Sequence, residues 1–309
     1  MMASFTSIVI LSFDRPAMLA ESVRAALAQT HRSREIVVVD NESARSDEIA
    51  ALVAALGNQV RLVRTGGNRG FARGMNIGLR EARGELVLLT EDDMILDPDA
   101  LERFVAAEQC ADAPTLFSGV IRDRDSGTVW YAGGEQRLTG VYRSRLDHRG
   151  ASTVDAPSVY ATGYLTGALT FGRTSLLREL GGYRDEYFMY WEDVELCLRA
   201  QRRGVALAIV RDARASHFTP APGPASSFVE YHKVKNMLAT YVLHAAPHVL
   251  PEALFRYGVL ELFAAIRRGA GVAVHARALA WVLRHAAWLL RERGRLAAAG
   301  PLAGAGLRA

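Results

Sequence analysis

The sequence contains only two cysteines, Cys110 and Cys197, among 309 residues. Two thiols cannot build a disulfide framework or a four-ligand zinc site, so a reducing compartment is the default expectation. No uncharged apolar run reaches about 18 residues, which predicts no membrane-spanning helix. The apolar segment 1–13 lacks a preceding basic residue and a small-residue cleavage site, which favours a strand over a signal peptide. We therefore predict a cytoplasmic protein, either soluble or peripheral at the inner face of the cell membrane.

An excess of positive charge occurs only in the last part of the chain. The formal net charge is +4, yet residues 251–309 hold nine arginines and three glutamates, a local excess of +6. The preceding 250 residues are therefore close to neutral, at −2. A nucleic-acid-binding domain usually carries a basic face, so this distribution predicts no nucleic-acid partner.

The composition is that of a folded chain, with 50% hydrophobic and 23% charged residues. These proportions exclude disordered and low-complexity classes. Apolar runs at 7–11, 35–39, 60–64 and 85–90 predict strands, and segments 16–29, 47–56 and 71–82 between them predict helices. This β-α order predicts a parallel sheet whose ligands bind at the carboxyl ends of the strands. The stretch 112–160 yields no firm assignment, and about 229–295 is predicted to be helical.

Carboxylates gather at two places that this pattern makes prominent. Glu91, Asp92 and Asp93 follow a strand, where adjacent charges repel unless a cation or donors neutralise them. Oxygen ligands of this kind suit Mg²⁺ or Mn²⁺, although a solvated acidic turn is the alternative. Glu192 and Asp193 begin a helix, where Asp193 could act as a general base or simply stabilise the helix N-terminus.

Three other features are ambiguous by themselves. The aromatic run 187–191 could form a sugar platform or belong to the core. His217, which follows a strand, could be a ligand or structural. The turn 67–70 could cradle phosphate, but the chain has no Walker motif because no Gly-Lys-Ser/Thr follows it.

In their joint order, these features resemble family 2 glycosyltransferases with the GT-A fold, and most closely the rhamnosyltransferase-like members that build bacterial surface polysaccharides. The similarity extends over about 230 residues. The matching stretches are 8–19, EIVVVDNES at 35–43, GNRGFARGMNIG at 67–78, LVLLTEDDMILDPDAL at 86–101, GALTFGR at 167–173, GGYRDEYFMYWEDVELCLR at 181–199 and ARASH at 213–217.

The resemblance implies a role for each matching residue. Asp193 corresponds to the proposed catalytic base of the family's ED motif, and Asp93 and His217 correspond to metal positions. Glu91 and Asp93 stand at the outer positions of the DxD motif, where Glu91 departs from the usual aspartate. Asp14 likewise replaces a more usual asparagine. The positions expected to bind substrate are Ser12, Asp14, Asp40, Asn41, Asn68, Arg69, Gly70, Asn76, Glu91, Asp92, Trp191 and Glu192.

The fold implied is α/β, a GT-A domain with a mostly parallel mixed sheet flanked by helices, followed by a C-terminal helical extension. The expected boundaries are 1–245 for the GT-A domain, with a nucleotide-sugar half at about 1–110 and an acceptor half at about 111–245. An Arg-rich helical extension follows at 246–309.

The activity implied is inverting, metal-dependent transfer of a sugar to a hydroxyl of a glycan or lipid-linked acceptor. The donor would be a nucleotide sugar, such as dTDP-rhamnose or a UDP-sugar, and the metal Mg²⁺ or Mn²⁺. Direct displacement needs no enzyme nucleophile, and the sequence has no Ser-His-Asp or Cys-His signature. The alternative is a non-catalytic sugar-nucleotide or glycan-binding protein with the same fold. A nucleotidyltransferase fits less well because the chain lacks a Gly-rich, Lys-ended N-terminal loop.

The C-terminal extension carries a pattern of its own. The 4-3-4-3-4 spacing of its Arg and Trp residues predicts one helix face, formed by Arg277, Trp281, Arg284, Trp288, Arg291 and Arg295. Such a face suits an anionic membrane surface. The alternative is a helix packed on its own domain and covered by arginine stems.

Overall fold

A computed structural model describes residues 4–219, 226–269 and 271–302. The N-terminal half alternates strands with helices, as the apolar pattern predicts. Its elements are β1 (Thr6–Ser12), α1 (Pro16–Leu27), β2 (Arg34–Asp40), α2 (Ser46–Ala55), β3 (Val60–Arg64), α3 (Gly70–Glu81) and β4 (Leu86–Glu91).

The second half of the sheet is more irregular, and it includes the stretch that the sequence left unassigned. Its elements are β5 (Met94–Leu96), α4 (Ala100–Gln109), β6 (Thr115–Asp123), β7 (Val129–Tyr131), β8 (Gly134–Leu138), β9 (Tyr142–Leu146), β10 (Val159–Ala161), β11 (Leu169–Arg173), α5 (Thr174–Leu180), the 3₁₀ turn η1 (Asp185–Tyr187), α6 (Glu192–Arg202) and β12 (Ala206–His217).

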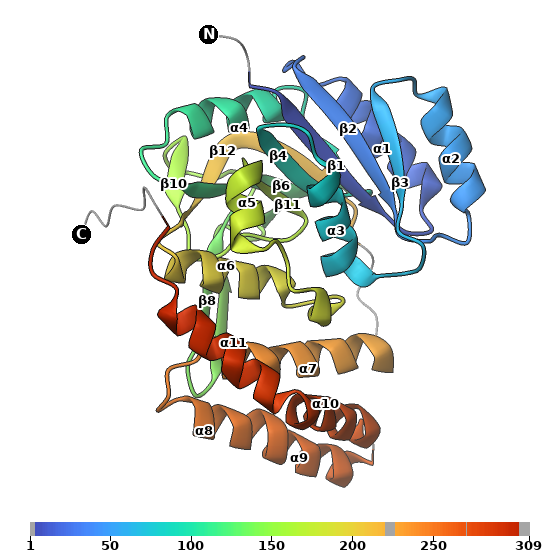
Figure 1. The fold of residues 1–309 in the computed structure, drawn as a ribbon. Helices are drawn as coiled ribbons and strands as arrows, with labels where there is room; N and C mark the ends of the chain where they lie inside the picture. The colour runs from blue at the N-terminus through green and yellow to red at the C-terminus, as the bar shows by residue number, and fades with distance from the viewer. Residues whose placement is uncertain (1–3, 220–225, 270, 303–309) are drawn as a thin grey trace.

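The strands form one mixed sheet with the order β10-β12-β6-β11-β4-β1-β2-β3. The neighbours of β1 are parallel to it, as are β2 to β3 and β6 to β12, whereas β11 is antiparallel to β4. Strand β5 pairs with β12, and β8 and β9 form a separate hairpin. Figure 1 shows helices flanking the sheet. The predicted fold class, a mostly parallel mixed α/β sheet with C-terminal helices, is confirmed.

Burial in the sheet explains its continuous apolar runs. Every residue of β1 is buried, as are the last five residues of β2 and the first five of β4. Strands covered by helices on both faces have no solvent-facing positions, so their sequences do not alternate. The polar residues of these segments therefore lie at the strand ends, which is where the candidate site forms.

The C-terminal region is a stack of separate helices. These are α7 (Ser227–His244), α8 (Leu250–Leu254), the π-helical segment η2 (Phe255–Leu260), α9 (Glu261–Arg268), α10 (Val272–Arg284) and α11 (Ala286–Ala298). In Figure 1 they lie on the far side of α6 from the sheet, with α8 and α9 farthest from it. Within the described residues, none of the helices combines the length and apolarity needed to cross a bilayer.

The prediction of one continuous Arg/Trp face is wrong. The helix stops at His285 (φ −101°, ψ 9°), so Trp281 belongs to α10 and Trp288 to α11. Both indoles pack against a buried cluster that includes Leu238 and Leu243 of α7. The Nζ of Lys235 lies 4.7 Å from the Trp281 ring centroid. The tryptophans thus pack on the domain, because burying their large apolar rings against α7 is more favourable than exposing them to water.

Candidate active site

The acidic cluster forms where β1 and β4 end side by side. Their register pairs Leu11 with Glu91, so Ser12 and Asp92 meet just beyond the paired residues. The Ser12 hydroxyl donates to Asp92 Oδ2 at 2.8 Å, and the Phe13 N–H reaches the same oxygen at 3.3 Å. Asp92 is fully buried. It therefore joins the two strand ends rather than projecting into a cavity.

Arg15 supplies the positive charge that this cluster needs. Its guanidinium lies 2.6 Å from Asp92 Oδ1 and 2.5 Å from Asp93 Oδ2. Arg15 is not among the residues that the sequence predicted for the site. The only hint in the sequence was its position after β1, just before the proline that begins α1. Arg15 reaches the acidic cluster because β1 and β4 are neighbours, and the sequence alone does not show that adjacency.

Asp93 and His217 meet through a second strand pairing. Residue Met94 pairs with His217 in the ladder between β5 and β12, which brings His217 Nε2 to 3.6 Å from Asp93 Oδ1. That oxygen is buried and has no hydrogen-bond partner among the residues that the structure describes. The His217 ring packs on Trp130, with ring centroids 4.6 Å apart. Although burial opposes ionisation of Asp93, the neighbouring His217 and Arg15 hold its pKa below the ordinary value.

These two side chains fit the requirements of a divalent metal. Two ligands that each lie about 2.1 Å from one ion can be at most about 4.2 Å apart, and 3.6 Å is within that limit. Among the residues that the structure describes, no group of three or more His, Cys, Asp or Glu side chains is arranged around a common point. Few protein ligands suit Mg²⁺, which commonly takes one or two carboxylates and completes its shell with water and substrate phosphate.

The loops after β1 and β2 are joined by hydrogen bonds. The Ala44 N–H donates to Asp14 Oδ1 at 2.6 Å, and the Asp14 N–H donates to Ser43 Oγ at 2.9 Å. Asp40 is fully buried; it accepts from the Ser43 N–H at 3.0 Å and from the Ser46 hydroxyl. Both aspartates thus organise the loop before α2, and neither lines the cavities described below. Substrate binding by Asp14 and Asp40 stays a prediction.

The turn before α3 is organised by two asparagines. The Arg69 N–H donates to Asn41 Oδ1 at 2.9 Å, the Asn41 amide donates to the Gly70 carbonyl at 3.2 Å, and the Gly70 N–H donates to Asn68 Oδ1 at 2.9 Å. Gly70 has φ +73°, and a Cβ there would lie 2.4 Å from the Phe188 carbonyl. Glycine is therefore needed where this turn meets the aromatic run. The Arg69 side chain instead folds back onto the Gly66 carbonyl, 3.1 Å away.

Two cavities adjoin these residues. The first, which we call the apolar cavity, has a volume of about 380 Å³. Its polar groups come from Arg15, Asn41, Asn68, Gly70 and Glu91, and its apolar walls include Phe13, Phe71, Phe188 and Met189. A concave site with apolar walls and a few fixed polar groups is typical of ligand binding.

The second, which we call the acidic cavity, has a volume of about 430 Å³. It is lined by Glu91, Trp130, Glu192, Asp193 and His217, among others, and it shares Glu91 with the apolar cavity. Burial, with a further contribution from Asp93, raises the pKa of Glu91 to about 8. Burial, and after it the charge of Asp193, raises the pKa of Glu192 well above its ordinary value. Within the described part of the chain, Glu192 Oε2 has no hydrogen-bond partner.

Asp193 lies in the first turn of α6, where it is partly buried and lines the acidic cavity. Its Oδ2 accepts from the Tyr164 hydroxyl at 2.5 Å and from the Gly167 N–H at 3.2 Å, and its Oδ1 accepts from the Val194 N–H at 2.7 Å. Burial raises the pKa of Asp193, while these donors lower it. The result is a carboxylate that is held firmly and is more basic than usual. Tyr164 lies between the unassigned stretch 112–160 and the motif at 167–173, so no sequence pattern pointed to it.

The aromatic run is a strained loop held by α7. Phe188, Tyr190 and Trp191 have positive φ angles of 65°, 65° and 71°, which cost energy in residues other than glycine. The Asn236 amide lies 2.9, 2.8 and 2.6 Å from the carbonyl oxygens of Tyr187, Met189 and Tyr190. Asn236 therefore stabilises the backbone that leads into Asp193.

Two further predicted residues lie outside the cavities. Asn76 of α3 donates to the Tyr183 carbonyl at 2.6 Å and accepts from the Tyr183 N–H at 2.8 Å, so it holds the chain just before the loop. Trp191 ends the loop and packs against Tyr142 of β9, with ring centroids 4.5 Å apart. Neither residue lines the apolar or the acidic cavity. Direct substrate contact by either stays a prediction.

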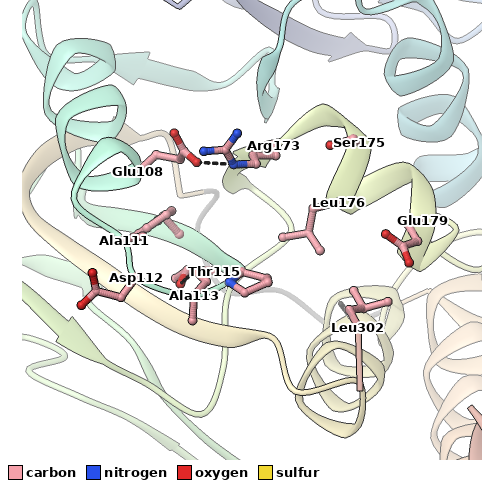
Figure 2. Close-up of a pocket in the computed structure, with 12 residues that line it drawn as sticks. Glu108, Ala111, Asp112, Ala113, Thr115, Arg173, Ser175, Leu176, Glu179 and Leu302 are labelled. Atoms are coloured by element: carbon pink, nitrogen blue, oxygen red, sulfur yellow. Dashed lines mark hydrogen bonds and ion pairs between the residues drawn. The ribbon is translucent and has the colours of Figure 1, made fainter. Parts of the chain in front are cut away.

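A third cavity of about 320 Å³ lies at the other end of the sheet (Figure 2). It is near the start of β4, because Arg173 on its wall pairs with Leu86. Its charged pair, Arg173 and Glu108, is 2.5 Å apart, as the dashed line in Figure 2 marks. None of the predicted site residues lines this third cavity. The acidic cluster 91–93 lies at the opposite end of β4.

The architecture has a counterpart among solved glycosyltransferases. The structure of GalNAc-T7 with UDP, GalNAc and Mn²⁺ matches 91% of this chain and 57% of that chain, with a TM-score of 0.69 and 16% sequence identity. At this identity the match shows the fold alone. The family model "Glycosyltransferase like family 2" matches residues 3–236. The chain belongs to this family and is a glycosyltransferase.

Two curated relatives are named for rhamnosyl transfer and for O-antigen synthesis. An N-acetylglucosaminyl-diphospho-decaprenol L-rhamnosyltransferase of Mycobacterium tuberculosis is 25% identical over 80% of this chain and 86% of its own length. The O-antigen biosynthesis protein RfbC of Myxococcus xanthus is 28% identical over 72% of this chain, but the match spans only 18% of that protein.

Proposed function

We propose that this chain is an inverting, metal-dependent glycosyltransferase that moves a sugar from a nucleotide diphosphate donor to a hydroxyl group. The observation that carries the proposal is the acidic cavity, where Asp193 and His217 line one space and Asp93 lies against His217. A base and a leaving-group site must lie on either side of one sugar in a direct displacement. In this proposal Asp193 supplies the base, and Asp93 with His217 marks the leaving-group site.

Asp193 is the base in this proposal. Its raised pKa favours accepting a proton, and its three donors keep the carboxylate oriented. The acceptor hydroxyl would lose its proton to Asp193 as the oxygen attacks the anomeric carbon and the bond to the nucleoside diphosphate breaks. The product would therefore have the opposite anomeric configuration. No covalent enzyme intermediate is required.

Asp93 and His217 are the residues proposed to hold Mg²⁺ or Mn²⁺. When bound, such an ion supplies positive charge that stabilises a departing diphosphate. Arg15 already contacts Asp92 and Asp93 and lines the apolar cavity, so its guanidinium can also bind phosphate oxygens there.

The donor and acceptor are assigned by chemical class. The apolar cavity, which Asn41 and Asn68 line, is proposed to take the nucleoside of dTDP-rhamnose or a UDP-sugar. The acceptor is proposed to be a hydroxyl of a glycan or lipid-linked sugar. The relatives named for O-antigen and rhamnosyl transfer support a place in polysaccharide synthesis.

The test is release of nucleoside diphosphate from a panel of nucleotide sugars, with Mn²⁺ or with EDTA. We expect turnover with Mn²⁺ and none with EDTA. Asp93→Ala should lose both turnover and the Mn²⁺-dependent thermal shift with donor. Asp99→Ala is the control, because its carboxylate pairs with Arg103 at the surface. Donor binding without release would instead favour a binding protein. Full turnover in EDTA would remove the metal from the proposal.

A further inference from the structure

The segment α8–η2–α9 has two faces of different character. On its inner side, Ala253, Gly258 and Ala265 are buried. On its outer side, large apolar residues lie open to solvent: Phe255, Val259, Leu260, Phe263 and Ile266 are 56%, 38%, 45%, 60% and 53% exposed. We call these five residues the outer face.

The outer face is an unusual feature for a surface helix. The spacing of Phe255, Val259, Phe263 and Ile266 by four, four and three residues keeps them on one side of a helix. Figure 1 shows α8 and α9 at the end of the molecule away from the sheet. A contiguous exposed apolar surface of this kind usually marks an interaction site.

The charge around the outer face distinguishes between possible partners. Arg256, Arg267 and Arg268 belong to the same segment as the outer face, and two of them pair with its glutamates: Arg256 with Glu252 at 3.3 Å and Arg268 with Glu261 at 3.8 Å. The segment keeps an excess of one positive charge, within a C-terminal region, 251–309, that carries nine arginines against three glutamates. A second copy of the chain would bring arginines of like sign together across a two-fold interface. An apolar strip bordered by arginine instead matches an anionic lipid surface, where the rings enter the interface and the guanidinium groups contact phosphate.

We propose that the outer face docks on an anionic membrane surface. This assigns membrane contact to α8–η2–α9 rather than to the Arg/Trp residues of α10 and α11, whose indoles pack on α7. The docking proposal rests on the proposed function in one respect: a lipid-linked acceptor would be located at the membrane.

The inner side of the same segment connects to the site. The Tyr257 hydroxyl accepts from the Tyr142 N–H at 2.6 Å, and the Tyr142 ring packs on Trp191 with ring centroids 4.5 Å apart. Trp191 directly precedes Glu192 and Asp193. A helix lying on the membrane would thus be connected through one hairpin to the loop that presents the base.

Co-sedimentation with vesicles tests the proposal. The full chain should bind phosphatidylcholine vesicles containing phosphatidylglycerol, bind pure phosphatidylcholine weakly, and release as salt rises. Phe263→Ser combined with Ile266→Ser should reduce binding at least about tenfold. Arg267→Gln combined with Arg268→Gln should weaken it and flatten the salt dependence. The matched control is Phe5→Ser combined with Val159→Ser, which changes two exposed apolar residues on the sheet domain, 38% and 42% exposed.

Thermal unfolding and nucleoside diphosphate release by each variant separate this proposal from the proposed function. We expect both to match wild type, since the changed residues are exposed and outside the cavities. Absence of binding to anionic vesicles, or undiminished binding by the Phe263/Ile266 variant, would overturn the docking surface. So would a concentration-dependent dimer that this variant abolishes, which would assign the face to a second copy. Retained binding with no release by any variant would contradict the catalytic proposal alone.

Discussion

Asp193 combines two properties that usually oppose each other. Burial makes its carboxylate more basic, while the Tyr164 hydroxyl and two backbone N–H groups stabilise its charge. A general base works best when its pKa is near the working pH and its orientation is fixed. Both conditions follow from its place in the first turn of α6, facing Tyr164 and Gly167.

The first prediction at the residue scale concerns this basicity. Asp193→Asn keeps the size of the side chain but cannot accept the proton, so kcat should fall by about 10²–10⁴-fold. Donor affinity, measured by thermal shift, should stay near wild type. Glu179→Gln, a 60% exposed carboxylate on α5, is the control and should leave kcat unchanged. An unchanged kcat in Asp193→Asn would leave helix stabilisation as the role of this residue.

The second prediction concerns Tyr164. Tyr164→Phe removes the hydroxyl that lowers the pKa of Asp193, so that pKa should rise further above its ordinary value. Because the base must be deprotonated, kcat/KM falls as pH drops through this pKa. The acidic limb of the profile should therefore move to higher pH. A hydrogen bond to a charged group contributes about 1.5–3 kcal/mol, and one pKa unit is about 1.4 kcal/mol, so a shift of about one unit is expected at this half-buried site.

Tyr160→Phe is the matched control for this measurement. Its hydroxyl donates to the Ala132 carbonyl at 2.8 Å, away from Asp193. Its profile should overlay that of wild type. If Tyr164→Phe lowers the rate equally at every pH, the hydroxyl has some other role than setting the proton affinity of Asp193.

At the scale of elements, α7 supports the catalytic loop. Asn236 contacts three loop carbonyls, and Lys235 Nζ donates to the Glu186 carbonyl at 2.7 Å. His232 Nδ1 lies 3.2 Å from the Tyr187 carbonyl. A run with three non-glycine residues at positive φ would relax without such contacts, because each strained residue costs about 1–3 kcal/mol.

The third prediction follows from this support. Asn236→Ala leaves buried carbonyls without their donor, at about 1–3 kcal/mol for each unsatisfied group. The melting temperature should fall, and kcat should drop about tenfold or more even when assayed well below it. Glu230→Ala, on the exposed first turn of the same helix, should change neither. A lower melting temperature with unchanged kcat would mean that the loop keeps its conformation without Asn236.

At the scale of the whole molecule, the C-terminal helices complete the core beneath the site. Val282, Leu289 and Leu296 are buried in one cluster with Tyr187 and with Leu238 and Leu243 of α7. Arg293 donates to the carbonyls of Val242 and Ala245 at 2.7 and 2.8 Å. The extension is thus part of the packing that holds α7, although its boundary at residue 246 stays a prediction.

The fourth prediction is that truncation after Gly269 destabilises the protein. Removing three buried side chains, each contributing about 1.5–3 kcal/mol, approaches the whole stability of a typical domain, about 5–15 kcal/mol. The truncated chain should be insoluble or melt far below the full chain in thermal unfolding. The control is the chain ending at residue 302, which keeps all described helices. A soluble truncated chain with an unchanged melting temperature would show that α10 and α11 are an independent attachment.

The sequence by itself determined the strands, helices and acidic ends of the N-terminal half. Continuous apolar runs mark buried parallel strands, so the predicted strand at 60–64 coincides with β3, and Glu91–Asp93 follow β4. These are local properties, encoded in neighbouring residues. The motif order also identified the family, which the family comparison confirms.

Only the tertiary structure decided which distant residues meet. Arg15 reaches Asp93 because β1 and β4 are adjacent, Tyr164 reaches Asp193 across 29 residues, and Asn236 reaches Tyr190 across 46. The sequence also did not determine where Trp281 and Trp288 pack. Helical spacing places residues on one face only if the helix is continuous, and here the helix stops at His285. Contacts between distant segments depend on packing and register, and a single sequence records these only indirectly.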